Sequence, residues 1–256
     1  MPRSKQEPLN KHYDENYKNN NILEIGIDEA GRGPLFGRVY TAAVILPKDD
    51  DFDFSKMKDS KKFSSEKKIT EVAEYIKENA VSWAVTYNDE KTIDKINIRQ
   101  SVLTSMHESI KSVISNLSSK NANSVNNSIE YDNNNNSIDC DNNSNISDNS
   151  NYFLLVDGND FKPYMRYTDD GLIPINHTCI EGGDNKYCAI AAASILAKTE
   201  RDKYIDELCK ENPELVEKYG IDKNKGYGTK KHLDGIKNNG ISKWHRKTYG
   251  ICKDYC

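Results

Sequence analysis

Two adjacent acids, Asp28 and Glu29, stand directly before a cluster of glycines in the segment GIDEAGRGPLFGR, residues 26–38. Carboxylates can hold a divalent cation, and glycines let a backbone approach a phosphate or a sugar closely. The glycines also resemble the fingerprint of a dinucleotide site, but that fingerprint requires a following helix whose N-terminus holds the pyrophosphate. Pro34 and β-branched residues follow here instead, so we expect a metal site.

A site for two cations around a phosphate needs several more oxygen ligands. Asp157 ends the apolar stretch LLVDG, and Asp184 lies between two glycines and a long apolar segment. Taken singly, each acid also fits a structural role: a turn for Asp157, a helix N-cap for Asp184 and a surface turn for the first pair. Together, four acids at the ends of elements predict one phosphoryl-transfer site at one edge of a sheet.

The elements that must position these acids alternate between strands and helices. Short runs rich in β-branched residues predict strands, and apolar residues three or four positions apart predict helices. Small residues at 189–194 predict a helix that packs closely on a sheet, and the mixture of elements predicts an α/β fold. The predicted strands are 22–27, 39–46, 81–87, 152–156 and 176–180, and the predicted helices are 69–76, about 98–117 and 187–209.

Composition divides the chain unevenly. The stretch 121–151 is almost entirely Asn, Ser and Asp, without Lys or Arg, and has too little apolar content to form a core. Because it carries five acids, the rest of the chain has a net charge of about +1 although the total is -4. We expect a disordered polar tail at 1–20 and a single domain at 21–256, with a disordered Asn-rich insertion at 118–151 and a basic C-terminal extension at about 212–256.

Charge and cysteine content narrow the class of protein further. Residues 218–247 contain nine Lys and Arg against two Asp, which is either a phosphate-binding surface or a solvated charged face. No apolar stretch reaches the roughly 18 residues that span a membrane, and the polar N-terminus has no signal-peptide core. The six cysteines form no CxxC pair, so we expect reduced thiols and a cytoplasmic protein.

Five stretches of the sequence occur in the order found in the ribonuclease HII family. They are GIDEAGRGPLFG, DSKKFS, LLVDGN, GDNKYCAIAAASILAKTERD and KNKGYGTKKHLDGIKNNG, followed by HR at 245–246. The resemblance covers roughly residues 22–249, and its GRG turn and KGYGTKKH stretch are similar to the bacterial type. The chain departs from the family pattern at Arg38, where Pro is usual, and at Ser101, where Ala is usual.

This resemblance implies a ribonuclease H-like fold, a mixed β-sheet flanked by helices with a C-terminal helical extension. It also implies two Mg²⁺ or Mn²⁺ ions, one helping to deprotonate the attacking water and the other stabilising the leaving 3′-oxygen. The implied catalytic and metal-binding residues are Asp28, Glu29, Asp157 and Asp184.

Substrate contacts follow from the same resemblance. The backbone of Gly31, Arg32 and Gly33 is implied to contact the ribose 2′-OH, and Tyr227 to pack on the neighbouring sugar. Four further residues could hold phosphates, although solvated lysines are an equal alternative for the first two: Lys61, Lys62, Lys186 and Lys198.

The implied activity is metal-dependent endonucleolytic hydrolysis of the RNA strand of RNA–DNA hybrids. Cleavage 5′ of ribonucleotides embedded in duplex DNA, leaving 5′-phosphate and 3′-hydroxyl ends, would serve ribonucleotide excision in DNA replication and repair. The alternative is a catalytically inactive protein that binds hybrids. We expect a monomer whose partners are RNA–DNA hybrids and ribonucleotide-containing duplex DNA, with no membrane association and no protein partner evident in the sequence.

Overall fold

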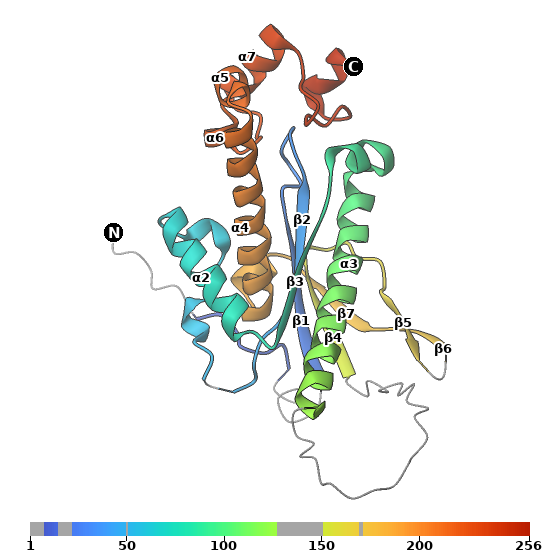
Figure 1. Ribbon diagram of the computed structural model, residues 1–256. Helices are drawn as coiled ribbons and strands as arrows, with labels where there is room; N and C mark the ends of the chain where they lie inside the picture. The colour runs from blue at the N-terminus through green and yellow to red at the C-terminus, as the bar shows by residue number, and fades with distance from the viewer. Residues whose placement is uncertain (1–7, 15–21, 50, 127–150, 169–170) are drawn as a thin grey trace, which may run out of the picture.

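A computed structural model of the chain describes residues 8–14, 22–49, 51–126, 151–168 and 171–256, with the backbone alone described over 120–126. Its centre is a five-stranded mixed sheet in the order β3-β2-β1-β4-β7 (Figure 1). All five predicted strands are present within one to three residues of the expected ends. They are β1 (Ile22–Ala30), β2 (Val39–Ile45), β3 (Ser82–Asn88), β4 (Asn151–Asp157) and β7 (Asn176–Ile180).

The direction of the strands decides where the acids lie. β1 pairs with β2 antiparallel and with β4 parallel, and the parallel register sets Ile27 opposite Val156. Asp28 and Asp157 each follow one of these paired residues, so both lie at the edge of the sheet where β1 and β4 end. The expected convergence of acids from two strands is therefore built into the topology.

Helices cover both faces of the sheet, as the α/β prediction requires. α4 (Cys188–Glu211) and α2 (Glu66–Asn79) lie on one face, and α3 (Glu90–Asn126) lies on the other (Figure 1). α4 packs closely because a Cβ atom on Gly26 of β1 would lie 2.1 Å from the carbonyl carbon of Ala189. The predicted run of small residues is thus the surface on which α4 meets β1.

Helix α3 corrects two predicted boundaries. It begins at Glu90 rather than near Ile98, and it is interrupted at Asn97, whose φ of 66° is non-helical. It also continues to Asn126, although the Asn-rich insertion was expected to begin at 118, because adding residues to an existing helix costs little even for polar side chains. The strand β4 already starts at Asn151, and 127–150 lie outside the described residues.

The expected N-terminal tail is partly ordered, which is a second correction. The amide of Asn10 donates to the Lys186 carbonyl at 2.8 Å, and the Cys188 amide donates back to Asn10 at 2.9 Å. Tyr13 also stacks on Phe153, with ring centroids 5.4 Å apart. From its polar composition alone, this segment was expected not to recover the entropy lost on ordering. These contacts supply the stabilisation that offsets that loss.

One hairpin was not predicted. Strands β5 (Met165–Thr168) and β6 (Gly171–Pro174) form a separate two-stranded sheet that projects beside β7 (Figure 1). Each strand has four residues, which is too short for an alternating pattern to stand out.

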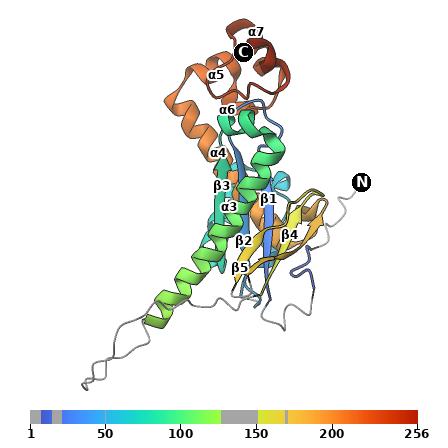
Figure 2. The ribbon, with the colours of Figure 1, turned by 90° about the vertical axis from the view of Figure 1, so that its right-hand side faces the viewer.

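The C-terminal extension consists of short helices beyond the end of α4 (Figure 2). An isolated bridge joins Phe36, in the loop between β1 and β2, to His245. None of the helices within the described ranges is both long and apolar enough to cross a bilayer. The remaining elements are α5 (Glu214–Tyr219), α6 (Ile221–Asn224), α7 (Lys230–Asn239) and the 3₁₀ turns η1 (Phe54–Lys56), η2 (Ser60–Lys62), η3 (Gly183–Asn185) and η4 (Gly250–Tyr255).

Candidate active site

A cavity of about 590 Å³ opens at the edge of the sheet where β1 and β4 end. Its lining joins segments that are far apart in sequence: the end of β1, η2, the end of β4, η3, one side of α4 and the turn around Tyr227. The structure thus brings the four predicted acids into one cavity with the GRG turn. These acids are Asp28, Glu29, Asp157 and Asp184.

Each of three acids is fixed by a hydrogen bond to nearby chain. The Glu29 amide donates to Asp28 Oδ1 at 2.7 Å, and the Gly183 amide donates to Asp157 Oδ1 at 2.6 Å. Asn185 Nδ2 donates to Asp184 Oδ1 at 3.0 Å. The carboxylates are therefore oriented by the turn at the end of β1 and by η3 before any ligand arrives.

The acids oppose one another electrostatically. Burial, followed by the charges of Glu29 and Asp157, holds the pKa of Asp28 well above its usual value. Burial also raises the pKa of Glu29 against the opposing effect of Arg32, and it raises the pKa of Asp184 with help from Asp59 and Asp157. Closely spaced carboxylates in a partly buried cavity favour neutralisation by a proton or a cation.

The donor set fits a hard divalent cation, because all four side chains offer carboxylate oxygens. In the described part of the chain, however, no three His, Cys, Asp or Glu side chains converge closely enough to form a ready ligand cluster. One oxygen of Asp28 and one of Asp157 already accept backbone bonds. The carboxylates share the cavity without closing on one point.

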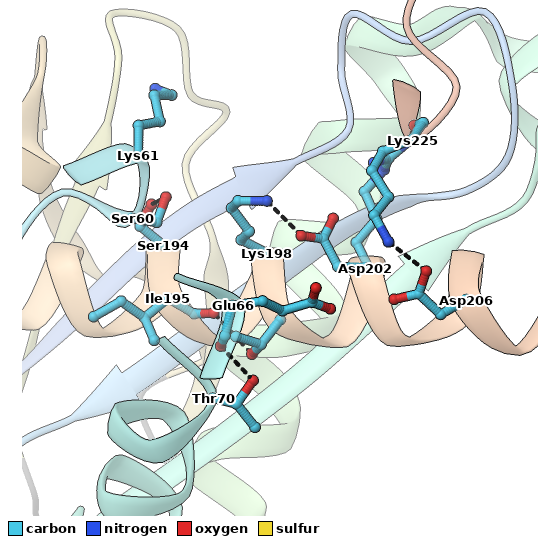
Figure 3. Close-up of polar contacts among 12 residues, drawn as sticks. Ser60, Lys61, Glu66, Thr70, Ser194, Ile195, Lys198, Asp202, Asp206 and Lys225 are labelled. Carbon is cyan, nitrogen blue, oxygen red and sulfur yellow. Dashed lines mark hydrogen bonds and ion pairs between the residues drawn. The ribbon is translucent and has the colours of Figure 1, made fainter. Parts of the chain in front are cut away.

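Figure 3 shows three lysine side chains of this region, Lys61, Lys198 and Lys225, the last two bonded to aspartates. Lys61 of η2 and Lys198 of α4 line the cavity, as predicted, and Lys198 pairs with Asp202 one turn along the helix. Lys225, which the sequence did not single out, also lines the cavity and pairs with Asp206. These three side chains add positive charge to the cavity lining, and two of them have a carboxylate partner.

Two predicted lysines lie outside this cavity lining. Lys186 is exposed, and its Nζ donates to the Glu181 carbonyl at 2.8 Å. Its own carbonyl accepts from Asn10, so the residue belongs to the contact with the N-terminal segment. Lys62 is not part of the lining but donates to Oδ1 of Asn185, which is.

The GRG turn has a backbone that few other residues could adopt. Gly31 has a φ of +93°, and a Cβ atom there would lie 2.2 Å from Arg201 Nε. Tyr227 lies directly beside the turn, since a Cβ atom on Gly33 would be 3.6 Å from its ring. The Tyr227 side chain is half exposed, at 51%, so its ring is accessible next to the backbone of the turn.

Two buried histidines support the carbonyl of Tyr227. The Ser242 amide can only donate, so Nδ1 of His245 accepts from it at 2.9 Å. The proton of His245 is then on Nε2, which donates to Nε2 of His232 at 3.0 Å, and Nδ1 of His232 donates to the Tyr227 carbonyl at 2.9 Å. Burial lowers the pKa of both rings, that of His245 to about 3, so this chain of bonds requires two neutral imidazoles.

Several residues of the site escaped the sequence interpretation. Ser194 lines the cavity, and its hydroxyl both bonds Asp28 and lies 3.0 Å from that of Ser60. A lone hydroxyl within the apolar run AAASILA was the available clue. Arg201 is buried and donates to the Lys225 carbonyl at 2.8 Å, a pairing that no local pattern indicates.

The two departures from the family pattern lie outside the cavity. The Arg38 guanidinium is held between the rings of Tyr87 and Tyr204, at 4.1 and 4.3 Å from their centroids. Ser101 is fully buried in α3, and its hydroxyl donates to the Asn97 carbonyl at 2.8 Å. Both residues therefore have structural contacts of their own.

A mixed sheet flanked by helices, with four carboxylates gathered in a basic cavity, defines a protein of the ribonuclease H class. The family model described as Ribonuclease HII matches residues 25–251. Ribonuclease HII of Bacteroides fragilis is 39% identical over 236 residues, covering 92% of this chain and 93% of its own. That of Parabacteroides distasonis is 38% identical over 235 residues, covering 92% and 94%. The chain belongs to the ribonuclease HII family, which are endoribonucleases with ribonuclease H activity on RNA–DNA hybrids.

Solved structures agree with the fold. Ribonuclease H2 of Pyrococcus horikoshii superposes with a TM-score of 0.60 at 18% identity, covering 91% of this chain and 96% of that one. The manganese complex of a ribonuclease HIII, called Bst-RNase HIII, has a TM-score of 0.57 at 16% identity and covers 92% and 69%. At these identities the likeness establishes the shared ribonuclease H-like fold.

A third solved structure bears on protein partners. It is the complex of PCNA with ribonuclease HII from Archaeoglobus fulgidus, with a TM-score of 0.57 at 20% identity, covering 89% of this chain and 95% of that one. A protein of this family therefore does bind another protein. This finding weakens the expectation, drawn from the sequence, that the present protein has no protein partner.

Proposed function

We propose that this protein is a metal-dependent endonuclease that cuts on the 5′ side of ribonucleotides in duplex DNA, as well as within the RNA strand of hybrids. The observation that carries the proposal is the single cavity that four carboxylates share with the GRG turn and Tyr227. Acids alone would serve many hydrolases. A sugar-sized recognition surface directly beside them makes the ribose the distinguishing feature of the substrate.

The carboxylates are the proposed metal ligands. Two Mg²⁺ or Mn²⁺ ions, when bound, would activate the attacking water and neutralise charge on the leaving 3′-oxygen, giving 5′-phosphate and 3′-hydroxyl ends. The chain's part is to hold Asp28 and Asp157 by backbone amides and to concentrate negative charge that bound cations would neutralise. Lys61 and Lys198 line the cavity and orient the substrate phosphates.

Ribose recognition is proposed for the GRG turn and Tyr227. The backbone of the turn can come within hydrogen-bonding distance of a 2′-OH because Gly31 and Gly33 carry no side chain. The exposed ring of Tyr227 offers a flat apolar face for the adjoining sugar.

The oligomeric state and the cellular compartment are part of the same proposal. We also propose that the protein acts as a monomer. The five cysteines within the described residues are free thiols, which supports a reducing compartment such as the cytoplasm.

A direct test uses a DNA duplex with one ribonucleotide, incubated with Mg²⁺, with Mn²⁺ and with a chelator. We expect one cut on the 5′ side of the ribonucleotide with either metal and none with the chelator. An all-DNA duplex of the same sequence is the matched control and should stay intact. Binding of the ribonucleotide duplex without cleavage in either metal would select the alternative, an inactive hybrid-binding protein.

A further inference from the structure

The side chain of Arg246 is fully buried, and it lies among carbonyl groups of the loop 31–38 that follows β1. Its five N–H groups match five carbonyl oxygens of that loop, which is the full donor capacity of a guanidinium. Nε donates to Gly37 at 2.8 Å, Nη1 to Arg32 at 3.1 Å and Pro34 at 2.8 Å, and Nη2 to Gly31 at 2.6 Å and Arg38 at 3.2 Å.

This arrangement is unusual in its charge balance. Within the ranges that the structure describes, Arg246 forms no ion pair with a carboxylate. Burial lowers its pKa to about 10, so the guanidinium is still charged at neutral pH. A buried charge without a counter-charge is costly, and here the five loop carbonyls compensate for it together with the ring of Tyr249.

The carbonyls that Arg246 binds determine where the next amides point. In a trans peptide the C=O of one residue and the N–H of the next point in opposite directions. Because the carbonyls of Gly31 and Arg32 point toward the buried guanidinium, the amides of Arg32 and Gly33 point away from it. Neither amide donates to another group of the described chain, and both residues line the cavity.

We infer that Arg246 is the positioning residue that makes the protein selective for a ribonucleotide: it turns the amides of Arg32 and Gly33 toward the substrate's 2′-OH. This inference rests on the proposed function of the GRG turn. Arg246 itself does not touch the substrate, because it is buried behind the loop.

Neighbouring residues keep the guanidinium in place. The backbone amide of Arg246 donates to the Leu35 carbonyl at 2.9 Å, and the ring of Tyr249 lies 5.0 Å from the guanidinium carbon. The Tyr249 hydroxyl donates to the Arg32 carbonyl at 3.0 Å, which Arg246 also binds. Tyr249 therefore holds the same peptide group from a second side.

The test measures binding rather than cutting, so that recognition is separated from catalysis. In the Asp157→Asn background, dissociation constants are compared for a duplex with one ribonucleotide and for the same duplex made of DNA alone. Arg246→Lys keeps the charge but gathers three donors on one nitrogen, which cannot reach five separate carbonyls. We expect the preference for the ribonucleotide duplex to fall by about tenfold or more, since several bonds to the loop are lost.

Leu215→Ala is the matched control for stability. Leu215 is buried in the same C-terminal core and is not bonded to the loop. This variant should unfold at a lower temperature yet keep the preference. An equal loss of preference in Leu215→Ala, or a folded Arg246→Lys protein that keeps the preference, would overturn the inference.

Two further outcomes are distinguished in advance. If the Asp157→Asn parent shows no preference for the ribonucleotide, the proposed function of the GRG turn is wrong and not merely the role of Arg246. If circular dichroism shows that Arg246→Lys does not fold, Tyr249→Phe decides the question, because it removes one hydroxyl from the same peptide group. Its preference should fall about fivefold, the value of one hydrogen bond, and an unchanged preference would refute the inference.

Discussion

The two halves of the cavity are built on opposite principles. On the acidic side, burial and the charges of neighbouring carboxylates raise the pKa of Asp28 on β1 and of Asp184 on η3, so that side is at a higher free energy without cations. On the other side, the loop 31–38 has its carbonyls bonded by Arg246 and is in a low-energy state before the substrate arrives. The acidic side is relieved of repulsion only when its charges are neutralised, whereas the loop 31–38 is held in one shape by bonds within the chain.

This difference assigns a distinct task to each half. A cluster of carboxylates that repel one another is strongly stabilised when it binds cations. Those cations would lie where hydrolysis of a phosphodiester needs positive charge. A preorganised loop loses little entropy on binding, so it can discriminate between sugars that differ by one hydroxyl. Substitutions in the two halves should therefore have different signatures.

The largest effect is expected from Asp157→Asn. The amide can still accept the bond from the Gly183 amide but no longer holds a cation by charge, so the fold should persist while catalysis is lost. We expect the rate of cleavage to fall about 10³-fold, equivalent to about 4 kcal/mol of transition-state stabilisation.

Single-turnover cleavage and gel-shift binding measure the two quantities separately. Asp53→Asn is the matched control, because Asp53 is an exposed aspartate that caps η1 outside the cavity. Near-normal turnover in Asp157→Asn would show that the acidic side is not the catalytic side.

Truncation of Tyr227 tests the recognition side. The ring should matter more than the hydroxyl if it packs on a sugar, because stacking on an aromatic face contributes about 1–3 kcal/mol. Tyr227→Ala should therefore cut a single-ribonucleotide duplex about 10- to 100-fold more slowly, whereas Tyr227→Phe should remain close to the unaltered rate. Cleavage of a continuous hybrid and thermal unfolding are recorded in parallel.

The result separates a substrate contact from a structural tyrosine. A stability loss in Tyr227→Ala without a change in substrate choice would make the ring a structural group. Wild-type rates on both substrates in a well-folded Ala variant would remove Tyr227 from the recognition side.

Acidic pH should weaken the hydrogen bonds of His232 and His245 that support the carbonyl of Tyr227. The lowered pKa of His232 and His245 means that both bind protons more readily in the unfolded chain, whose imidazoles titrate near pH 6.5. The contribution of His245 is complete above that pH and declines as the pH falls toward 3, by about 1.4 kcal/mol per pH unit, and that of His232 declines in the same direction.

Urea unfolding at a series of pH values measures this slope. The acids Asp28, Glu29 and Asp184 act in the opposite direction, because their raised pKa means that protonation stabilises the folded state. His245→Asn should therefore flatten the acid-side decline between pH 5 and 6.5. Identical slopes with and without His245 would locate the acid sensitivity elsewhere.

The smallest effect is a gain in stability. Asp28→Asn removes a buried charge whose pKa is raised by burial and by its neighbours, so the folded state should become more stable at neutral pH as activity disappears. Each kcal/mol gained would raise the melting temperature by about 2–4 °C in a chain of this size. The gain should vanish when Mg²⁺ is present, and a lower melting temperature in metal-free buffer would contradict the repulsion described here.

Much of the acidic side could be predicted because its residues can be recognised from their neighbours in the sequence. Asp28 and Asp157 each end an apolar strand, and the pairing of parallel strands then brings them to one edge. Lys186 shows the limit of this reasoning, since its sequence neighbours suggested the cavity while its side chain bonds Glu181. A residue next to a site in sequence can point away from it in space.

The recognition side was predicted through its glycines and Tyr227, whereas the residues that hold it were not. Arg246 binds carbonyls of the loop 31–38, and backbone carbonyls leave no trace in a sequence pattern. The hairpin β5–β6 and the docked residues 8–14 were missed for a similar reason, since contacts made after folding stabilise segments of weak local preference.

The hydrogen bond between Gly31 and Arg246 also has a consequence during synthesis of the protein, because it spans 215 positions of the chain. Contacts between distant positions form late, after the intervening loop entropy has been overcome. While a ribosome is still adding residues, β1 can already carry its acids, but the loop after it has no guanidinium to shape it. All four acids of the cavity are therefore synthesised before Arg246, and this side chain can hold the loop 31–38 only after residue 246 has been added.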